Sequence, residues 1–171
     1  MILVKPELEF KTEALAYRQE HFDNGEMIIN GSGLLDKTDS YEQWLQNVKN
    51  NADKKTVDKN WVLTDTYFAM DEDKKRIVGI IDLRYELNDF LKDIGNCGYS
   101  VRPSERRKGY AGEMLRQVVE KAKKYGLTEI HLSVEKDNIP SIKTILKNNG
   151  VYERSFEFEG KKADIYKIIV C

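Results

Sequence analysis

Apolar residues with the spacing of an α-helix stand out in the second half of the chain. They are Ala111, Met114, Leu115, Val118, Val119 and Ala122. Positions i, i+3, i+4, i+7, i+8 and i+11 lie on one face of a helix, so this stripe is suited to packing against a core. Gly126 ends the pattern, because glycine readily adopts the left-handed conformation of a C-terminal cap. We therefore predict a helix from about residue 111 to residue 126.

Three further helices are predicted from weaker patterns. The first enters at Pro6 and runs to about Phe22, because proline suits the first turn of a helix. A loop rich in glycine follows, from residue 23 to residue 38. The second helix begins after Asp39, which forms a capping-box pattern with Glu42. Its apolar face consists of Tyr41, Trp44, Leu45 and Val48.

The last predicted helix follows Asp137, which we assign as its cap. It contains Ile142, Ile145 and Leu146, and Gly150 ends it.

Runs rich in β-branched and aromatic residues predict strands between these helices. They span residues 2–4, 64–70, 76–87, 94–101, 129–134, 151–158 and 163–170. Residues 71–75 and Glu159-Gly160 are read as hairpin connections, and Pro103 stops the fourth run because proline cannot donate to a ladder. The order β α α β β β α β α β β predicts an α/β fold of the α+β type. We expect one domain over residues 1–171, with a central mixed, mostly antiparallel sheet flanked by about four helices.

Composition narrows the classes of function. The chain has 171 residues, with 28 Lys plus Arg against 29 Asp plus Glu, so it offers no broad positive field for a nucleic acid. No run approaches the roughly 20 apolar residues of a membrane span, and the first residues lack the pattern of a signal peptide. We therefore expect a cytoplasmic protein.

The few cysteines and histidines argue against a disulfide framework and a metal centre. Cys97 and Cys171 are far apart and form no CxxC pair. His21 and His131 are the two histidines of the chain. No metal is predicted.

The candidate chemistry lies in the turn between the strand at 94–101 and the long helix. The first amides of a helix have no partner within it and carry partial positive charge, which suits a phosphate. Gly109 allows close approach of the backbone, and Arg106, Arg107 and Lys108 add positive charge. A solvated basic run at a helix start is about equally consistent with this local pattern. Neither a GxGxxG fingerprint nor a Walker A motif is present.

A longer stretch carries a family resemblance. The run CGYSVRPSERRKGYAGEMLR resembles the acetyl-CoA-binding motif of the GNAT (GCN5-related N-acetyltransferase) superfamily, in which Gln or Arg is followed by two variable residues, Gly, one variable residue, and Gly or Ala. Arg106, Gly109 and Ala111 match that motif. The next run, HLSVEKDNIPSIKTILKNNG, is similar to the following strand and helix of the family, with Asn138 at the helix start.

The resemblance implies where acetyl-CoA binds. Two splayed strands, 94–101 and 129–135, would hold the pantetheine arm, with backbone groups of Tyr99, Ser100 and Val101 pairing to it. Asn138 would hydrogen-bond the same arm. The pyrophosphate would lie on the turn and helix start, where the implied residues are Arg106, Arg107, Lys108, Gly109, Tyr110, Ala111 and Gly112.

The resemblance also implies direct attack of a primary amine on the thioester. A backbone N–H near Tyr99 or Ser100 would stabilise the oxyanion, and a carboxylate, often through water, would act as the base. The family often protonates the leaving thiolate with a tyrosine of the helix after Asn138. Residues 139–149 contain none, and Ile145 lies near the expected place. Tyr152 or water is the remaining candidate acid.

Other polar groups have plainer interpretations that we favour. Asp82, Arg84 and Glu86 alternate on one strand face, which is more typical of a solvent-facing stripe than of an acceptor site. No base is assigned from them. Cys97 is better read as a small buried residue than as a nucleophile. The segment Gly31-Ser32-Gly33, with Asp36, is better read as a connecting loop than as a lid.

Three functions follow from these observations. The leading one is an N-acetyltransferase that moves an acetyl group from acetyl-CoA to an unidentified amine. The second is a noncatalytic acyl-CoA sensor or interaction domain, suggested by the missing tyrosine. The third is a nucleotide or nucleic-acid binding module that uses Arg102, Arg106, Arg107 and Lys108, and the balanced charge disfavours it.

Overall fold

The computed structural model of the protein describes every residue except 72, 74 and 171. Its helices are α1 (Lys11–Asp23), α2 (Tyr41–Asn51), α3 (Tyr110–Tyr125) and α4 (Ile139–Lys147), with short 3-10 turns at Leu8–Phe10, Leu35–Lys37 and Pro103–Glu105. Its strands are β1 (Ile2–Val4), β2 (Thr64–Asp71), β3 (Arg76–Arg84), β4 (Tyr99–Val101), β5 (Glu129–Glu135), β6 (Val151–Phe158) and β7 (Lys161–Ile169). The predicted element order is thus confirmed.

The strands form two sheets rather than one. The first has the order β1-β2-β3-β4 and the second the order β5-β7-β6. The pairs of named strands that the structure describes are all antiparallel. The mostly antiparallel character that we predicted is therefore confirmed, whereas a single mixed sheet is wrong: β4 and β5 end up as the edge strands of separate sheets.

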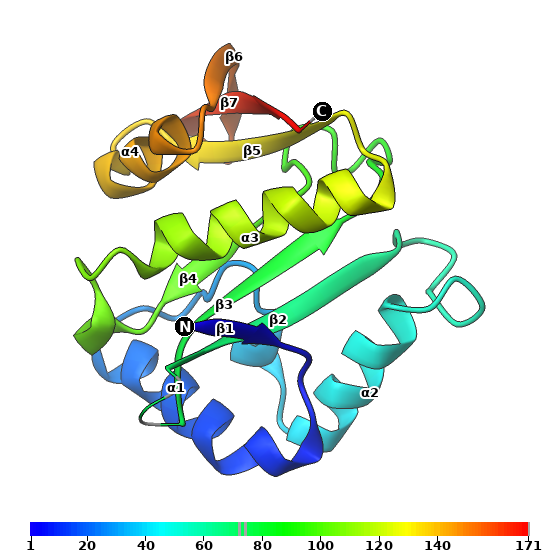
Figure 1. The fold of residues 1–171 in the computed structure, drawn as a ribbon, viewed down its shortest axis with the longest axis vertical. Helices are drawn as coiled ribbons and strands as arrows, with labels where there is room; N and C mark the ends of the chain where they lie inside the picture. The colour runs from blue at the N-terminus through cyan, green and yellow to red at the C-terminus, as the bar shows by residue number, and fades with distance from the viewer. Residues whose placement is uncertain (72, 74, 171) are drawn as a thin grey trace.

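Helices cover both faces of the first sheet (Figure 1). Helices α1 and α2 lie on one face, where Tyr17, Trp44, Phe68 and other buried side chains form one core. Helix α3 lies on the other face, between the two sheets, and its apolar stripe packs into a second core with β3, β5 and β7. The stripe predicted from the sequence thus joins the two sheets, because Met114, Leu115 and Val118 are fully buried.

Two helix caps differ from the predicted ones by a single residue. Helix α2 is capped by Ser40, whose hydroxyl accepts a hydrogen bond from the Gln43 N–H at 3.3 Å, instead of by Asp39. Helix α4 is capped by Asn138 instead of by Asp137. The last two positions before a helix both carry side chains that can cap in these segments, so sequence alone does not choose between them.

The third and fourth strands are shorter than predicted. Strand β3 ends at Arg84 rather than at residue 87, and β4 begins at Tyr99 rather than at residue 94. Gly95, with φ of 92°, turns the chain toward β5 and forms an isolated bridge with Leu132. A left-handed residue interrupts a regular ladder, so the early part of the predicted strand becomes the junction between the two sheets.

Candidate functional site

The two sheets are held together at one end by Asn96. Its backbone N–H donates to the His131 carbonyl at 2.7 Å, and its side-chain oxygen accepts from the His131 N–H at 2.8 Å. Its side-chain amide donates to the Arg84 carbonyl of β3 at 2.9 Å. Asn96 is buried, so these bonds replace water and fix the junction between β3 and β5. Beyond this junction, β4 pairs with β3 while β5 pairs with β7.

The backbone of β4 is bonded to β3 on one side. The Gly98 carbonyl accepts a hydrogen bond from β3 at 3.0 Å, and the Arg102 N–H donates to β3 at 2.8 Å. Ser100 lies midway between them and pairs with the same neighbour. Because backbone groups alternate along an antiparallel strand, those of Tyr99 and Val101 face away from β3, toward the sheet edge.

This alternation separates the three β4 residues predicted to hold the pantetheine arm. Tyr99 and Val101 present backbone groups at the edge, although the Val101 carbonyl also accepts from the Arg106 Nε at 3.2 Å. The Ser100 carbonyl accepts from the buried Tyr17 hydroxyl at 3.0 Å. Of the two residues considered as oxyanion donors, Tyr99 therefore has the better-placed N–H.

The turn that precedes α3 has a backbone suited to an anion. Arg107 has φ of 63° and Gly109 φ of 86°, and such left-handed residues bring successive amides to one side of the chain. In the part of the chain that the structure describes, no backbone acceptor is recorded for the amides of residues 107–112. A Cβ added to Gly109 would meet no heavy atom within 4 Å. The turn and first turn of helix thus offer open amide donors that fit a pyrophosphate.

The basic side chains of the turn are arranged less simply. The Arg106 guanidinium makes a bidentate contact with the Glu26 carboxylate, with N–O distances of 2.7 and 2.6 Å. The Lys108 Nζ lies 2.7 Å from a carboxylate oxygen of Glu105. Hydrogen bonds from Arg106, and then from His21, lower the pKa of Glu26 to about 2. We expected these side chains to bond a pyrophosphate, yet two of them already hold carboxylates. The groups of this turn that remain open to an anion are therefore mainly backbone amides.

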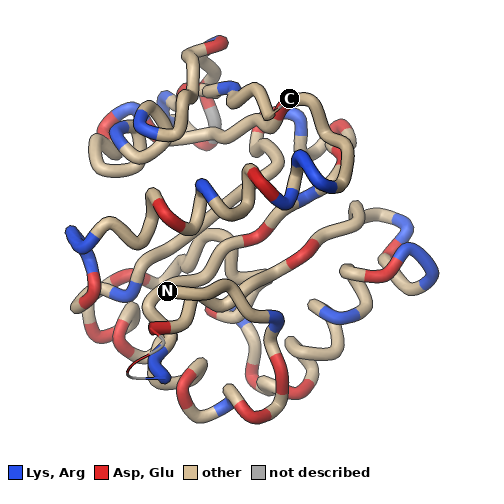
Figure 2. Tube along the Cα trace, viewed as in Figure 1, with Lys and Arg blue, Asp and Glu red and all other residues tan. Residues whose placement is uncertain are grey.

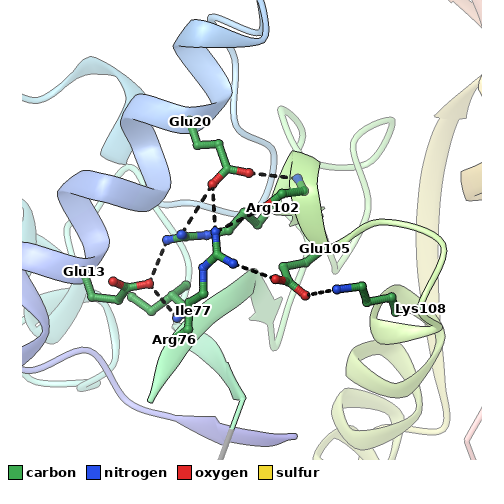
Figure 3. A network of polar contacts seen from close by, with 8 residues as sticks. Glu13, Glu20, Arg76, Ile77, Arg102, Glu105 and Lys108 are labelled. Carbon is green, nitrogen blue, oxygen red and sulfur yellow. Dashed lines mark hydrogen bonds and ion pairs between the residues drawn. The ribbon is translucent and has the colours of Figure 1, made fainter. Parts of the chain in front are cut away.

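A network of charged groups ties the segment before the turn to α1 and β3 (Figure 3). Arg102 is buried and contacts Glu13 at 2.8 Å and Glu20 at 3.4 Å, both on α1. Glu20 accepts from the Ser104 N–H at 2.8 Å. Arg76 of β3 reaches the buried Glu105 at 2.7 Å. These contacts fix the segment 102–105 to α1 and β3, which sets the direction in which the amides that follow point.

Helix α4 begins beside β4. The Asn138 side-chain oxygen accepts from the Ser141 N–H at 3.2 Å, which caps the helix. Among the residues that the structure describes, no partner is recorded for its amide NH₂ group, which can therefore donate to a ligand. The Tyr99 hydroxyl lies 2.7 Å from the Ser141 hydroxyl, so side chains of β4 and α4 meet across the space between the two elements. The far end of α4 is tied to α3, since Asn148 donates to the Gly112 carbonyl at 3.3 Å.

Asp82 and Arg84 are buried rather than solvent-facing, which corrects the interpretation of the alternating strand. Asp82 accepts from the Gly98 N–H at 2.7 Å and contacts Arg84 at 2.8 Å. Arg84 also donates to the Gly95 carbonyl at 2.9 Å. Glu86 lies beyond the end of β3 and is exposed. Asp82 thus holds Gly98 by its side chain as well as its backbone, which positions the Tyr99 N–H that follows.

Cys97 lies next to Gly98 in the segment before β4 and is poorly suited to nucleophilic attack. It is buried, and its side chain belongs to the core beneath α3. Burial, reinforced by the nearby Asp82 carboxylate, raises the pKa of the Cys97 thiol well above its usual value. A thiol that stays protonated is a weak nucleophile, so the apolar interpretation of Cys97 is supported.

The loop between α1 and α2 packs on β4 rather than only connecting two helices. Gly31 approaches so closely that an added Cβ would lie 2.1 Å from the Gly98 carbonyl oxygen. The Ser100 hydroxyl donates to the Asn30 carbonyl at 2.9 Å. Asp36 accepts from the buried Ser32 hydroxyl at 3.1 Å. This loop therefore lies against the strand that carries the candidate oxyanion donor.

Comparison with known families decides the identity of this arrangement. The sequence profile described as the acetyltransferase (GNAT) family matches residues 36–151. The chain belongs to this family. It is accordingly an acetyl-CoA-dependent N-acetyltransferase of the GNAT type. No match to the chain was found among curated protein sequences.

Solved structures share the same GNAT fold at low sequence identity. A presumed ribosomal-protein-serine acetyltransferase from Vibrio cholerae has a TM-score of 0.68 and 16% identity, covering 98% of this chain and 92% of its own. The microcin C7 self-immunity acetyltransferase MccE, solved with acetyl-CoA and AMP, has a TM-score of 0.70 and 15% identity, with coverages of 98% and 91%. A point variant of the spermidine N-acetyltransferase SpeG from Vibrio cholerae has a TM-score of 0.68 and 14% identity, with coverages of 99% and 95%.

Three further observations on this GNAT chain concern its charge distribution, groups of metal ligands and membrane-spanning helices. Lys and Arg are interspersed with Asp and Glu along the whole trace (Figure 2). Among the described residues, no group of three or more His, Cys, Asp or Glu is arranged to hold a metal ion. A search of the same residues found no helix with the length and apolar character needed to cross a membrane.

Tyr152, the side chain considered as a general acid, lies outside the region between β4 and β5. It belongs to β6, which β7 separates from β5. Its hydroxyl is 2.9 Å from the Ser155 hydroxyl, and it is 53% exposed. This position does not favour the role.

Sequence reasoning missed the supporting residues of the GNAT site. Glu26 and Tyr17 reach the turn and β4 from segments about 80 residues away in sequence. Nothing in the local sequence marks them. For Asp82 the signal was present, since a carboxylate within an otherwise apolar strand suggests a buried, bonded group.

Proposed function

We propose that the protein transfers the acetyl group of acetyl-CoA to a primary amine by direct attack. The observation that carries the proposal is the open row of amides at residues 107–112, at the start of α3. The family supplies the donor, and this turn is where a pyrophosphate fits. The pantetheine arm would then follow the edge of β4, past Val101 and Tyr99, with Asn138 donating to it from the start of α4.

In this arrangement the thioester carbonyl lies near the Tyr99 N–H, which stabilises the negative charge that develops on the carbonyl oxygen. Asp82 and β3 hold the preceding Gly98 rigidly. A donor that is already oriented needs no reorganisation during the reaction, and the loss of one such donor typically slows catalysis by about 100-fold or more.

The acceptor is an amine that reaches the thioester from the side of the α1–α2 loop. Support comes from the contacts of Gly31 with Gly98 and of Ser100 with Asn30, because both flank Tyr99, whose N–H we propose faces the thioester. Structural neighbours include enzymes named for spermidine and for a ribosomal-protein serine. Both a polyamine and a peptide N-terminus therefore belong in an acceptor screen.

The test combines binding and turnover. Calorimetric titration with CoA measures donor binding, and release of free thiol from acetyl-CoA measures transfer to spermidine, to single amino acids and to a peptide with an N-terminal serine. We expect CoA binding together with thiol release that depends on one class of amine. Absence of CoA binding by the folded protein would refute the proposal. CoA binding without amine-dependent release would favour the noncatalytic sensor instead.

A further inference from the structure

Breakdown of the tetrahedral intermediate releases CoA as a thiolate, which needs a hydrogen-bond donor or a proton. Helix α4 contains no tyrosine, and Ile145 is buried in the core. Tyr152 is removed from β5 by an intervening strand. The Cys97 thiol lies in the core beneath α3. An acid for the sulfur must therefore be sought elsewhere along the path of the arm.

Tyr99 is on that path. Its backbone lies at the edge of β4, and its side chain crosses to α4, where the hydroxyl lies 2.7 Å from the Ser141 hydroxyl. Ser141 is in the first turn of the helix that Asn138 caps. The same residue thus has its N–H at the strand edge and its hydroxyl against the start of α4, which are the two elements that would flank the arm.

We propose that Tyr99 is the catalytic residue that protonates the sulfur of CoA as it leaves. The inference rests on the proposed function. When the C–S bond breaks, its electron pair goes to sulfur, and sulfur takes the proton of the Tyr99 hydroxyl. The amine nitrogen loses one proton as the amide forms, and this proton returns to the phenolate oxygen through water or the Ser141 hydroxyl. Protons and charge balance without a further reactant.

The surroundings of Tyr99 keep its hydroxyl protonated. Burial is the main cause that raises the pKa of Tyr99, to about 12, while hydrogen bonds to Ser141 and Thr144 act in the lowering direction. The other titratable group that acts on the phenol is Cys97, two residues before it in the segment that leads into β4. The groups that act on it from α4 are the Ser141 and Thr144 hydroxyls. This pKa is higher than that of a thiol, near 8.5, so transfer of the phenol proton to a free thiolate would be unfavourable by itself. The proton therefore moves to sulfur as the phenol oxygen regains a proton from the amine nitrogen.

The first experiment compares tyrosine-to-phenylalanine variants in the thiol-release assay. Tyr99→Phe should lower kcat by roughly 100-fold, at the low end of the usual range of general acid catalysis, with CoA affinity nearly unchanged. Tyr125→Phe is the matched control, since Tyr125 ends α3 at the opposite end from the turn, and it should keep normal turnover. Equal kcat for Tyr99→Phe and the wild type would overturn the inference. So would a loss confined to Tyr152→Phe.

A second experiment needs no acceptor. The thiol of CoA bound to the protein is titrated by its ultraviolet thiolate absorbance. A hydrogen bond donated to the charged form lowers a pKa, so the bound thiol should titrate about one unit lower in the wild type than in Tyr99→Phe. If Tyr99 only ties β4 to α4, the two titrations will coincide and the inference fails. Failure of the wild type to bind CoA would refute the proposed function itself, which keeps the two results distinct.

Discussion

The contact between the α1–α2 loop and β4 can be tested with two glycines of nearly equal backbone conformation. Gly31 has φ of 74° and Gly25 φ of 76°. A Cβ on Gly25 would meet nothing within 4 Å, whereas a Cβ on Gly31 would lie 2.1 Å from the Gly98 carbonyl oxygen. Alanine at either position carries the same backbone strain, so the difference between the two variants reports on the contact alone.

The expected magnitudes follow from these distances. A left-handed alanine costs roughly 1–2 kcal/mol, and this is the whole effect expected for Gly25→Ala. At Gly31 the obstacle is backbone rather than a flexible side chain, so the loop must move away from β4. Overpacking of this kind adds roughly 1–3 kcal/mol. In a protein of this size 1 kcal/mol corresponds to roughly 2–4 °C in Tm, so Gly31→Ala should melt roughly 2–12 °C below Gly25→Ala.

Urea unfolding of the two variants, followed by tryptophan fluorescence, provides the free energies, and thermal unfolding provides Tm. Trp44 is a suitable reporter because its indole N–H donates to the Ser32 carbonyl of the same loop at 2.8 Å. If Gly31→Ala is as stable as Gly25→Ala, the loop does not pack on β4 as described. The α1–α2 loop would then not border the side of β4 from which we propose that the acceptor arrives.

Three further predictions concern the turn and its partners. Gly109→Glu should weaken CoA binding at least roughly 10-fold, because it adds bulk and negative charge beside the amides. Gly160→Glu is the control, since Gly160 is also left-handed and open but lies in the β6–β7 turn, and it should bind CoA normally. Equal affinities of the two variants in calorimetry would contradict this prediction. The pKa of Glu26 is about 2 in the folded protein against 4.5 ordinarily, so its ion pair with Arg106 stabilises the fold fully above about pH 4.5, and this stabilisation is lost as the pH falls toward 2. The free energy of unfolding in urea should therefore fall less on acidification for Glu26→Gln than for the wild type, by roughly 1–2 kcal/mol after solvent screening. Asn138→Asp should keep the helix cap, and hence Tm, but weaken CoA binding because it loses the amide donor; unchanged affinity would exclude a contact from Asn138 to the arm.

The helices and most strands were predictable because their signals are local. The spacing of the apolar residues from Ala111 to Ala122 determines which face of α3 is buried in the core. The division into two sheets was not predictable, since it depends on the left-handed Gly95 and on the bonds of Asn96 to both β3 and β5. A single sequence does not show which glycine is left-handed.

The candidate site was predictable to a similar extent. The turn at Arg106 was recognisable because its glycine, basic residues and helix start are contiguous. Its partner Glu26 was not, because a contact across 80 residues leaves no trace in a local pattern. The role proposed for the Tyr99 side chain likewise depends on α4 lying beside β4. Tertiary contacts rather than sequence neighbours therefore decide which groups reach the reacting atoms.

We propose that CoA binds along the edge of β4 and the start of α3. The most direct measurement is an amide NMR titration of the isotope-labelled protein with CoA. The largest shifts are expected at the amides of residues 107–112 and at those of Tyr99 and Val101. Shifts centred instead on the polar hollow lined by Asn47, Asn50 and Asp58, with the turn unaffected, would contradict this mode of CoA binding.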